Sequence, residues 1–292
     1  MPFLPDDYTA LVTQERTSSD EQLIAVWLHG RSEHTARAYR ADVERFRRAT
    51  GKPLAAVTLA DLQAFADSLE GAQASRYRTL SAVKSLLGFG HRIGYLPFDV
   101  GRVLRLPAVR SRLAERILAE ADLHRILNLE PSPRNRAILT LLYASGVRVS
   151  ELCGLSWRDL QPNGEGGQIT VFGKGSVTRA IQIPASVWKL VMGLRPAGAG
   201  LDDPVFASRK LKSGGRLKAL GVLRVVRGAA KRAGIDLPVS PHWFRHAHAS
   251  HALDRGAPIH LVQATLGHAN INTTGRYLHA RPQDSSSRFL PL

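Results

Sequence analysis

The sequence has little cysteine, no long apolar run and few acidic residues, and each shortage excludes a class of protein. A single cysteine, Cys153, cannot form an internal disulfide or build a zinc site alone. The longest apolar run, residues 137–144, is far below the ~20 residues that cross a bilayer. The first residues include early acids and lack the apolar core of a signal peptide. We therefore expect a cytoplasmic protein with no membrane partner.

The shortage of acids leaves a strongly basic chain. In 292 residues, 40 Lys and Arg stand against 24 Asp and Glu, which gives a net charge of +16. Such a balance indicates a polyanionic partner, with nucleic acid ahead of an anionic membrane surface. A surface that is merely soluble and basic is the alternative that composition alone leaves open.

Helical periodicity dominates the first third of the chain. Residues 1–18 have the composition of a loose tail, and residues 19–96 contain four amphipathic segments, which predict a small all-helical bundle. Basic residues lie off the apolar faces, with few acids to pair with them. We predict phosphate contacts there, although solvated helix faces would look similar, for five residues: Arg37, Arg40, Arg76, Arg78 and Lys84.

The periodicity fails over residues 97–116, where proline and glycine interrupt it. This segment is rich in arginine, including Arg102, Arg105 and Arg110. The composition predicts a basic linker whose arginines contact a DNA backbone, or else a solvated connector.

A second domain is expected over residues 117–283. Most of it has helical periodicity, and two strands are predicted, Gln168–Phe172 and Arg179–Pro184, joined by a hairpin connection at residues 173–178. The predicted fold class is therefore mainly α with a small antiparallel β-sheet, in two domains.

The stretch from residue 241 to residue 277 gathers the chemically active side chains. His242 and Arg245 are three residues apart and share one helix face. A second short helix is expected to stop at Gly267 and leave His268 at its exit, and a third is expected to carry Tyr277. Two histidines, an arginine and a tyrosine suit chemistry on a phosphodiester, because they clamp oxygens, move protons and supply a nucleophile.

These residues form three motifs, H-x-x-R at 242–245, L-G-H at 266–268 and T-T-x-x-Y at 273–277. The pattern resembles the C-terminal signature of the tyrosine recombinase (phage integrase) family, and most of all its Xer-like branch. Residues 19–96 are similar in size and order to the SAM-like core-binding domain of that family. Two further matches are Arg148, in a G-x-R-x-x-E-L context, and Lys174, in the expected hairpin.

The resemblance implies a catalytic set of six residues: Arg148, Lys174, His242, Arg245, His268 and Tyr277. Tyr277 would attack DNA and form a 3′-phosphotyrosyl intermediate while the two arginines bind the phosphate oxygens. His242 would accept the proton of Tyr277, Lys174 would protonate the leaving 5′ oxygen, and His268 would bind a phosphate oxygen. No ATP, metal or other cofactor is implied.

The resemblance also implies assembly on DNA. The partner would be a double-stranded recombination site bound by a homotetramer or heterotetramer, while the free protein would be a monomer or weak dimer. The tail at residues 284–292, with Phe289 and Leu290, would dock on a neighbouring protomer or pack on its own domain. Other interpretations are a type IB topoisomerase and a DNA-binding regulator that has kept only the fold.

Histidines on the same predicted helix raise a metal hypothesis. His242 and His246 have i,i+4 spacing, but the segment is not H-E-x-x-H and no carboxylate follows before Asp254. We therefore predict no metal site and expect His246, His248 and His251 to pack or to lie near phosphate.

Overall fold

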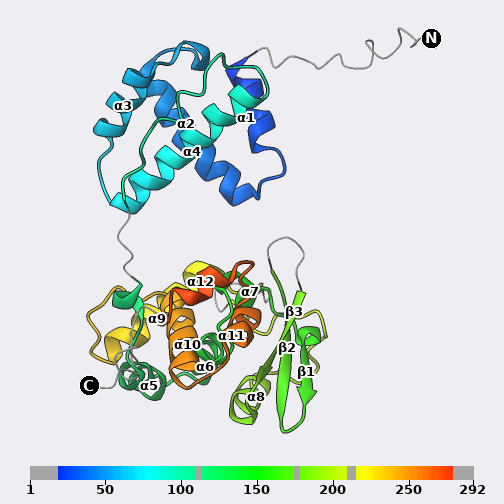
Figure 1. Ribbon diagram of the computed structural model, residues 1–292. Helices are drawn as coiled ribbons and strands as arrows, with labels where there is room; N and C mark the ends of the chain where they lie inside the picture. Colours follow the sequence, from blue (N-terminus) through cyan, green and yellow to red (C-terminus); the bar gives the residue numbers. More distant parts are fainter. Residues whose placement is uncertain (1–18, 109–112, 174–177, 209–214, 279–292) are drawn as a thin grey trace, which may run out of the picture. The chain divides into compact units, whose positions relative to one another are not determined.

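The computed structural model describes residues 19–108, 113–173, 178–208 and 215–278. The chain divides into two compact units, residues 1–110 and 111–292 (Figure 1). Within the described ranges, no helix has the length and apolar character that a membrane span requires. The predicted tail segments, 1–18 and 284–292, lie outside the described residues, as do Lys174 and Arg110.

The N-terminal unit is a helical bundle whose helices begin where the sequence supplies caps. The side chain of Ser19 accepts a hydrogen bond from the main chain of Gln22, and Thr58 forms a capping box with Asp61. Leu23 and Phe46 are fully buried between the helices. The elements are α1 (Asp20–Leu28), α2 (Glu33–Thr50), the 3₁₀ turn η2 (Leu54–Ala56), α3 (Leu59–Ser68) and α4 (Gln73–Arg92).

The first part of the expected linker packs on this bundle. Leu96 and Leu104 are buried in its apolar core. The Nζ of Lys84 donates hydrogen bonds to the carbonyl oxygens of Arg102, at 3.1 Å, and Leu104, at 2.9 Å. The proline and glycine breaks therefore end the helical periodicity but do not end the N-terminal unit.

The C-terminal unit is mainly helical, with one small sheet. Its core surrounds α6, from which Ile138, Leu139 and Leu142 are fully buried. Ser132 caps the start of α6 and Gly146 ends it. The helical elements are η3 (Ala114–Arg116), α5 (Glu120–Asn128), α6 (Pro133–Ser145), α7 (Val149–Gly154), η4 (Trp157–Asp159), α8 (Ala185–Met192), α9 (Ala219–Arg232), α10 (Pro241–Asp254), α11 (Ile259–Leu266) and α12 (Ile271–Gly275).

The sheet is antiparallel and has three strands in the order β1-β2-β3 (Figure 1). The strands are β1 (Leu160–Asn163), β2 (Gly166–Phe172) and β3 (Thr178–Ile183). The sequence predicted the second and third strands but missed β1. This strand is short, mostly exposed and contains Pro162, which an edge strand tolerates. The predicted fold class, mainly α with a small antiparallel sheet, is confirmed.

Candidate active site

Arg245 lies in the buried interior of the C-terminal unit. It projects from α10, is only 4% exposed, and its guanidinium meets two main-chain carbonyls from distant parts of the chain. Its Nη1 donates to the carbonyl oxygen of Gly146 at 2.6 Å, and its Nη2 donates to that of Leu266 at 2.7 Å. These bonds fix the guanidinium between the end of α6 and the end of α11.

The two helix ends that anchor the arginines both require glycine. Gly146 has a φ of 59° and Gly267 a φ of 65°, in the left-handed region. A Cβ on Gly146 would lie 2.7 Å from Leu266 and 2.8 Å from the ring of His248. A Cβ on Gly267 would lie 3.0 Å from Nη1 of Arg179, so the close packing is tightest at Gly146.

Arg148 is anchored beside Arg245 on the same turn. It stands directly before α7, and its Nη2 donates to the carbonyl oxygen of Gly267 at 3.3 Å. Its Nη1 donates to Glu151 at 2.9 Å, and its main-chain N–H donates to the other oxygen of the same carboxylate at 2.7 Å. The predicted arginines thus meet at the turn around residues 266 and 267.

Arg179 on β3 completes the anchoring, and sequence reasoning missed it. Two of its nitrogens donate to Glu151, at 2.9 and 2.8 Å, and its Nε donates to the carbonyl oxygen of Thr265 at 2.8 Å. The side chain is 10% exposed, so this basic residue points into the domain from an edge strand.

The electrostatic balance keeps this cluster charged. Burial alone would raise the pKa of Glu151, but hydrogen bonds from Arg179 and from the main chain of Arg148 outweigh it and hold the pKa at about 2. Burial, together with the nearby charge of Arg148, lowers the pKa of Arg245 to about 10. Arg245 and the carboxylate of Glu151 are therefore both ionised at neutral pH.

Tyr277 lies beyond the third helix, not on it as the sequence predicted. Helix α12 ends at Gly275, and Tyr277 follows in a turn closed by its N–H, which donates to the carbonyl oxygen of Thr274 at 3.0 Å. The side chain is 5% exposed and packs with Val262 and Leu266. Burial raises the pKa of its phenol, although Arg245 and Arg276 act in the opposite direction.

The partner of the Tyr277 hydroxyl is His246, which the sequence analysis had assigned to packing or a place near phosphate. The Nδ1 of His246 lies 2.8 Å from the phenolic oxygen. His242, the predicted proton acceptor, stacks on His246 with ring centroids 6.1 Å apart. Both histidines line a pocket of about 530 Å³ together with Arg116, Pro238, Ser240 and Trp243.

His268 lies at the exit of α11, as predicted. Its Nδ1 is 2.9 Å from the hydroxyl of the buried Thr274, which ties the L-G-H turn to the T-T-x-x-Y segment. Burial, together with the charges of Arg245, Arg148 and Arg179, lowers the pKa of this imidazole to about 4. The ring is therefore neutral at physiological pH.

The other two histidines of α10 have structural partners. His248 Nδ1 lies 2.7 Å from the carbonyl oxygen of Tyr143, so it donates there. His251 lies between the hydroxyl of Tyr143 and the carbonyl oxygen of Leu118. In the part of the chain that the structure describes, no three His, Cys, Asp or Glu side chains gather as a metal site requires.

The predicted DNA contacts of the N-terminal unit are less uniform than the sequence suggested. Arg37 pairs with Glu33 at 2.5 Å, and Arg78 pairs with the buried Asp42. Lys84 donates to carbonyls of its own unit, and its assignment as a DNA contact stays a prediction. Arg76 is half-buried, whereas three predicted contacts are exposed: Arg40, Arg102 and Arg105.

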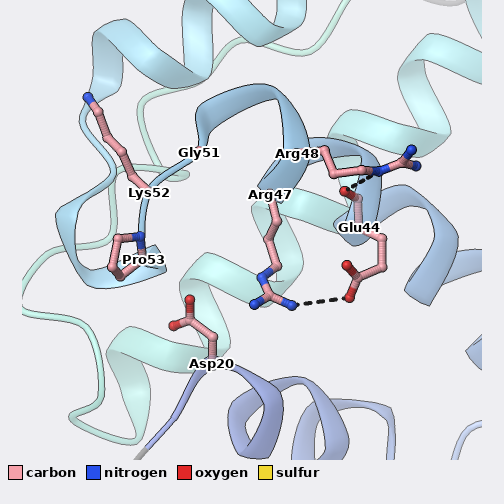
Figure 2. Close-up of a pocket in the computed structure, with 7 residues that line it drawn as sticks. All are labelled: Asp20, Glu44, Arg47, Arg48, Gly51, Lys52 and Pro53. Carbon is pink, nitrogen blue, oxygen red and sulfur yellow. Dashed lines mark hydrogen bonds and ion pairs between the residues drawn. The ribbon is translucent and has the colours of Figure 1, made fainter.

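Acidic side chains also pair with the basic residues at the end of α2, whereas the sequence analysis expected few acids to pair with them. Figure 2 shows Arg47 reaching the carboxylate of Glu44 and Arg48 donating to the main-chain carbonyl of Glu44. Arg47 pairs with Glu21 as well, and Lys52 pairs with Asp61 at 2.8 Å. The pocket in Figure 2 is therefore lined by charges that already have partners.

The fold and the site together define a class of DNA strand-breaking and rejoining enzyme, the tyrosine recombinases. Residues 115–284 match the phage integrase family, and residues 23–92 match the phage integrase N-terminal SAM-like domain. The chain belongs to the phage integrase family.

Named relatives agree with this assignment. The chain is 33% identical over 291 residues to a tyrosine recombinase XerC of Xylella fastidiosa (strain 9a5c), covering 96% of this chain and 92% of the relative. Its fold is similar to that of XerH site-specific recombinase bound to its difH substrate, with a TM-score of 0.70 at 20% identity over 93% of this chain and 83% of the other. It is also similar to a lambda integrase tetramer bound to a Holliday junction, with a TM-score of 0.69 at 18% identity over 92% and 83%.

Proposed function

We propose that this chain is a site-specific recombinase that uses Tyr277 to cut DNA and hold the cut end as a 3′-phosphotyrosyl intermediate. One observation carries the proposal: the Tyr277 hydroxyl is buried within a unit that also fixes the guanidiniums of Arg148 and Arg245 at one turn. The phosphoester energy stays in the protein–DNA bond, so rejoining needs no ATP.

The two arginines are proposed to bind the nonbridging oxygens of the scissile phosphate. Negative charge grows on these oxygens as the phenolic oxygen attacks, and a guanidinium presents donors in a fixed fork that matches them. Each arginine uses two of its side-chain nitrogens for anchoring, so the fork is already oriented before DNA binds. Such preorganised donors act without reorganisation in the transition state.

The remaining members of the set supply hydrogen bonds and protons. His268, held by Thr274, is proposed to bind a phosphate oxygen. Lys174, which lies outside the described residues, is proposed to protonate the leaving 5′ oxygen, as the family resemblance implies. His242 lines a pocket together with His246 and is proposed to contact phosphate there.

The proposed substrate is a double-stranded recombination site bound by several protomers. Two solved structures support this, because one holds a related recombinase on its DNA substrate and the other holds a tetramer on a Holliday junction. We propose a homotetramer or heterotetramer on DNA and a monomer or weak dimer without it, in the cytoplasm, where its DNA substrate lies. Docking of residues 284–292 on a neighbouring protomer stays a prediction.

The test is a covalent trapping experiment. Nicked DNA duplexes carrying candidate sites are incubated with the protein in excess EDTA, and the adduct is mapped by mass spectrometry. A 3′-phosphotyrosyl bond on Tyr277 supports the proposal. An adduct on another residue, or cleavage that stops in EDTA while DNA binding persists, contradicts it. Relaxation of supercoils without any preferred site would instead assign the chain to the type IB topoisomerases.

A further inference from the structure

We propose that His246 is the group that takes the phenolic proton of Tyr277 as the DNA strand is cut. The six-residue set does not include His246, and the sequence analysis assigned this role to His242. The inference rests on the proposed function, since it assigns one step of that reaction. It begins from the contact between the ring nitrogen Nδ1 of His246 and the phenolic oxygen, 2.8 Å apart.

The hydrogen bond has a definite direction if the imidazole is neutral. A phenol donates its proton, so Nδ1 accepts it and the ring carries its own hydrogen on Nε2. Burial, followed by the charges of His242, Arg116, Arg245 and Arg276, lowers the pKa of His246 to about 4. The ring is therefore neutral at physiological pH, and Nδ1 has a lone pair directed at the nucleophile.

The same neighbours make the basicity of His246 depend on the substrate. The charged and titratable groups around the ring are His242 and Arg245 on α10, Arg116 on η3, and Arg276 and Tyr277 after α12. They include three arginines, which disfavour a positive charge on the imidazole. A DNA phosphate brings negative charge that offsets the arginines, so the pKa of His246 rises when DNA occupies the site. The base thus gains strength in the complex in which it is needed.

The step balances in atoms and electrons. The O–H bond of Tyr277 breaks, its oxygen forms a bond to phosphorus, and the proton moves to Nδ1 of His246. The bond from phosphorus to the 5′ oxygen breaks, and the leaving oxygen takes a proton from the general acid, proposed to be Lys174. During rejoining each proton returns along the same path.

The arrangement of the two histidines separates their roles. The rings of His242 and His246 stack, and the Tyr277 hydroxyl has its hydrogen bond with Nδ1 of His246. We therefore assign the proton transfer to His246 and phosphate contact to His242. His242 is free to contact phosphate from the pocket that both rings line.

Two substitutions of His246 distinguish a proton acceptor from a residue that only positions Tyr277. In His246→Asn, a side-chain oxygen can accept the phenolic hydrogen bond but cannot take the proton, and in His246→Ala neither is possible. We expect both variants to bind DNA and to cleave roughly 100-fold or more slowly than the unmodified protein. His260, exposed on α11, gives the matched control His260→Asn, which should cleave at the normal rate. Cleavage by His246→Asn at near the normal rate would overturn the proposal.

A modified substrate identifies which proton transfer is impaired. With sulfur in place of the bridging 5′ oxygen, the leaving group needs no general acid. The sulfur substrate should rescue Lys174→Ala but leave the His246 variants slow, because their defect is on the attacking side. Rescue of His246→Asn by sulfur would place the residue on the leaving-group side and reject the inference. An unmodified protein that forms no adduct on Tyr277 would instead reject the proposed function itself.

A measurement on the intact ring needs no His246 variant. Nitrogen-15 NMR of the histidine side chains should show His246 with a proton on Nε2 and an unprotonated Nδ1, and the Nδ1 signal should shift in Tyr277→Phe. A proton on Nδ1 at neutral pH would rule out the acceptor role, whatever the kinetics of the variants.

Discussion

Arginine is abundant in both units of this molecule but is held in different ways. In the N-terminal unit Arg37 and Arg78 pair with carboxylates and stay substantially exposed. In the C-terminal unit Arg245 is buried and bound to two main-chain carbonyls. Exposed arginines contribute charge that salt screens, whereas the buried ones have a fixed position and direction. We propose that one unit supplies affinity for a polyanion and the other supplies chemistry.

The largest effect should come from removing the nucleophile. Tyr277→Phe keeps the ring that packs with Val262 and Leu266 but deletes the hydroxyl that bonds to His246. We expect DNA binding to persist and the covalent adduct to disappear, as seen by gel shift and by denaturing electrophoresis on nicked sites. An adduct that survives in this variant would move the nucleophile to another residue.

Next in size is the exchange of a buried arginine for lysine. Arg245→Lys keeps the charge but cannot bond to both carbonyls and still present a fork to phosphate. We expect single-turnover cleavage to fall by roughly 100- to 1000-fold, by analogy with the loss of an oxyanion donor. The control is Arg45→Lys on the exposed face of α2, which should cleave normally. If Arg245→Lys and Arg45→Lys slow cleavage equally, the buried arginine has no special part in the chemistry.

A smaller effect concerns the acid stability of the C-terminal unit. The pKa of Glu151 is held at about 2, below its ordinary value of 4.5, so the unfolded state binds its proton first as the pH falls. This stabilisation is complete above about pH 4.5 and is lost between there and pH 2, amounting to at most about 3 kcal/mol. The free energy of unfolding in urea should be larger for the unmodified protein than for Glu151→Gln at about pH 4.5, and this difference should shrink as the pH falls to about 2. If the difference in the free energy of unfolding stays constant over this pH range, Glu151 is not the titrating group.

The smallest effect tests the arginines of the expected linker. If Arg102, Arg105 and Arg110 meet phosphates, replacing them by alanine should reduce the slope of log affinity against log salt by roughly 0.9 for each phosphate that is no longer neutralised. Lys84→Met is the contrasting variant, because the ammonium of Lys84 bonds to carbonyls of its own unit. It should lower the unfolding temperature of the N-terminal unit and leave the slope unchanged. If Lys84→Met reduces the slope and the arginine variant does not, Lys84 contacts phosphate and the three arginines do not.

Sequence reasoning predicted the parts of the fold that local signals determine. The helical periodicity of residues 19–96 predicted a bundle, and the structure has α1 to α4 there. Sequence reasoning placed His268 at the exit of a helix, because Gly267 marks the end of that helix. It extended the last helix too far, since the turn at residues 275–277 has no proline to mark its start.

The interactions that sequence reasoning missed are all made between distant segments. Arg179 reaches Glu151 and Thr265 from a strand, and His246 reaches Tyr277 across 31 residues. These pairs are far apart in the sequence and form no local motif, so only the packed structure shows that they are in contact. The charge of Lys84 likewise predicted a partner of opposite sign but could not indicate a carbonyl of the same chain.

The anchoring of the two arginines on Gly146 and Gly267 affects how this site can vary in evolution. The acceptors at both turns are peptide oxygens, which every residue carries, so a point mutation cannot delete them as it could delete a carboxylate. It can only displace them by adding a side chain where φ is positive. We therefore expect substitution of either glycine to disturb the arginines, because it displaces the carbonyl oxygens that hold them. Neighbouring side chains can change during evolution without removing these acceptors, because the acceptors belong to the backbone.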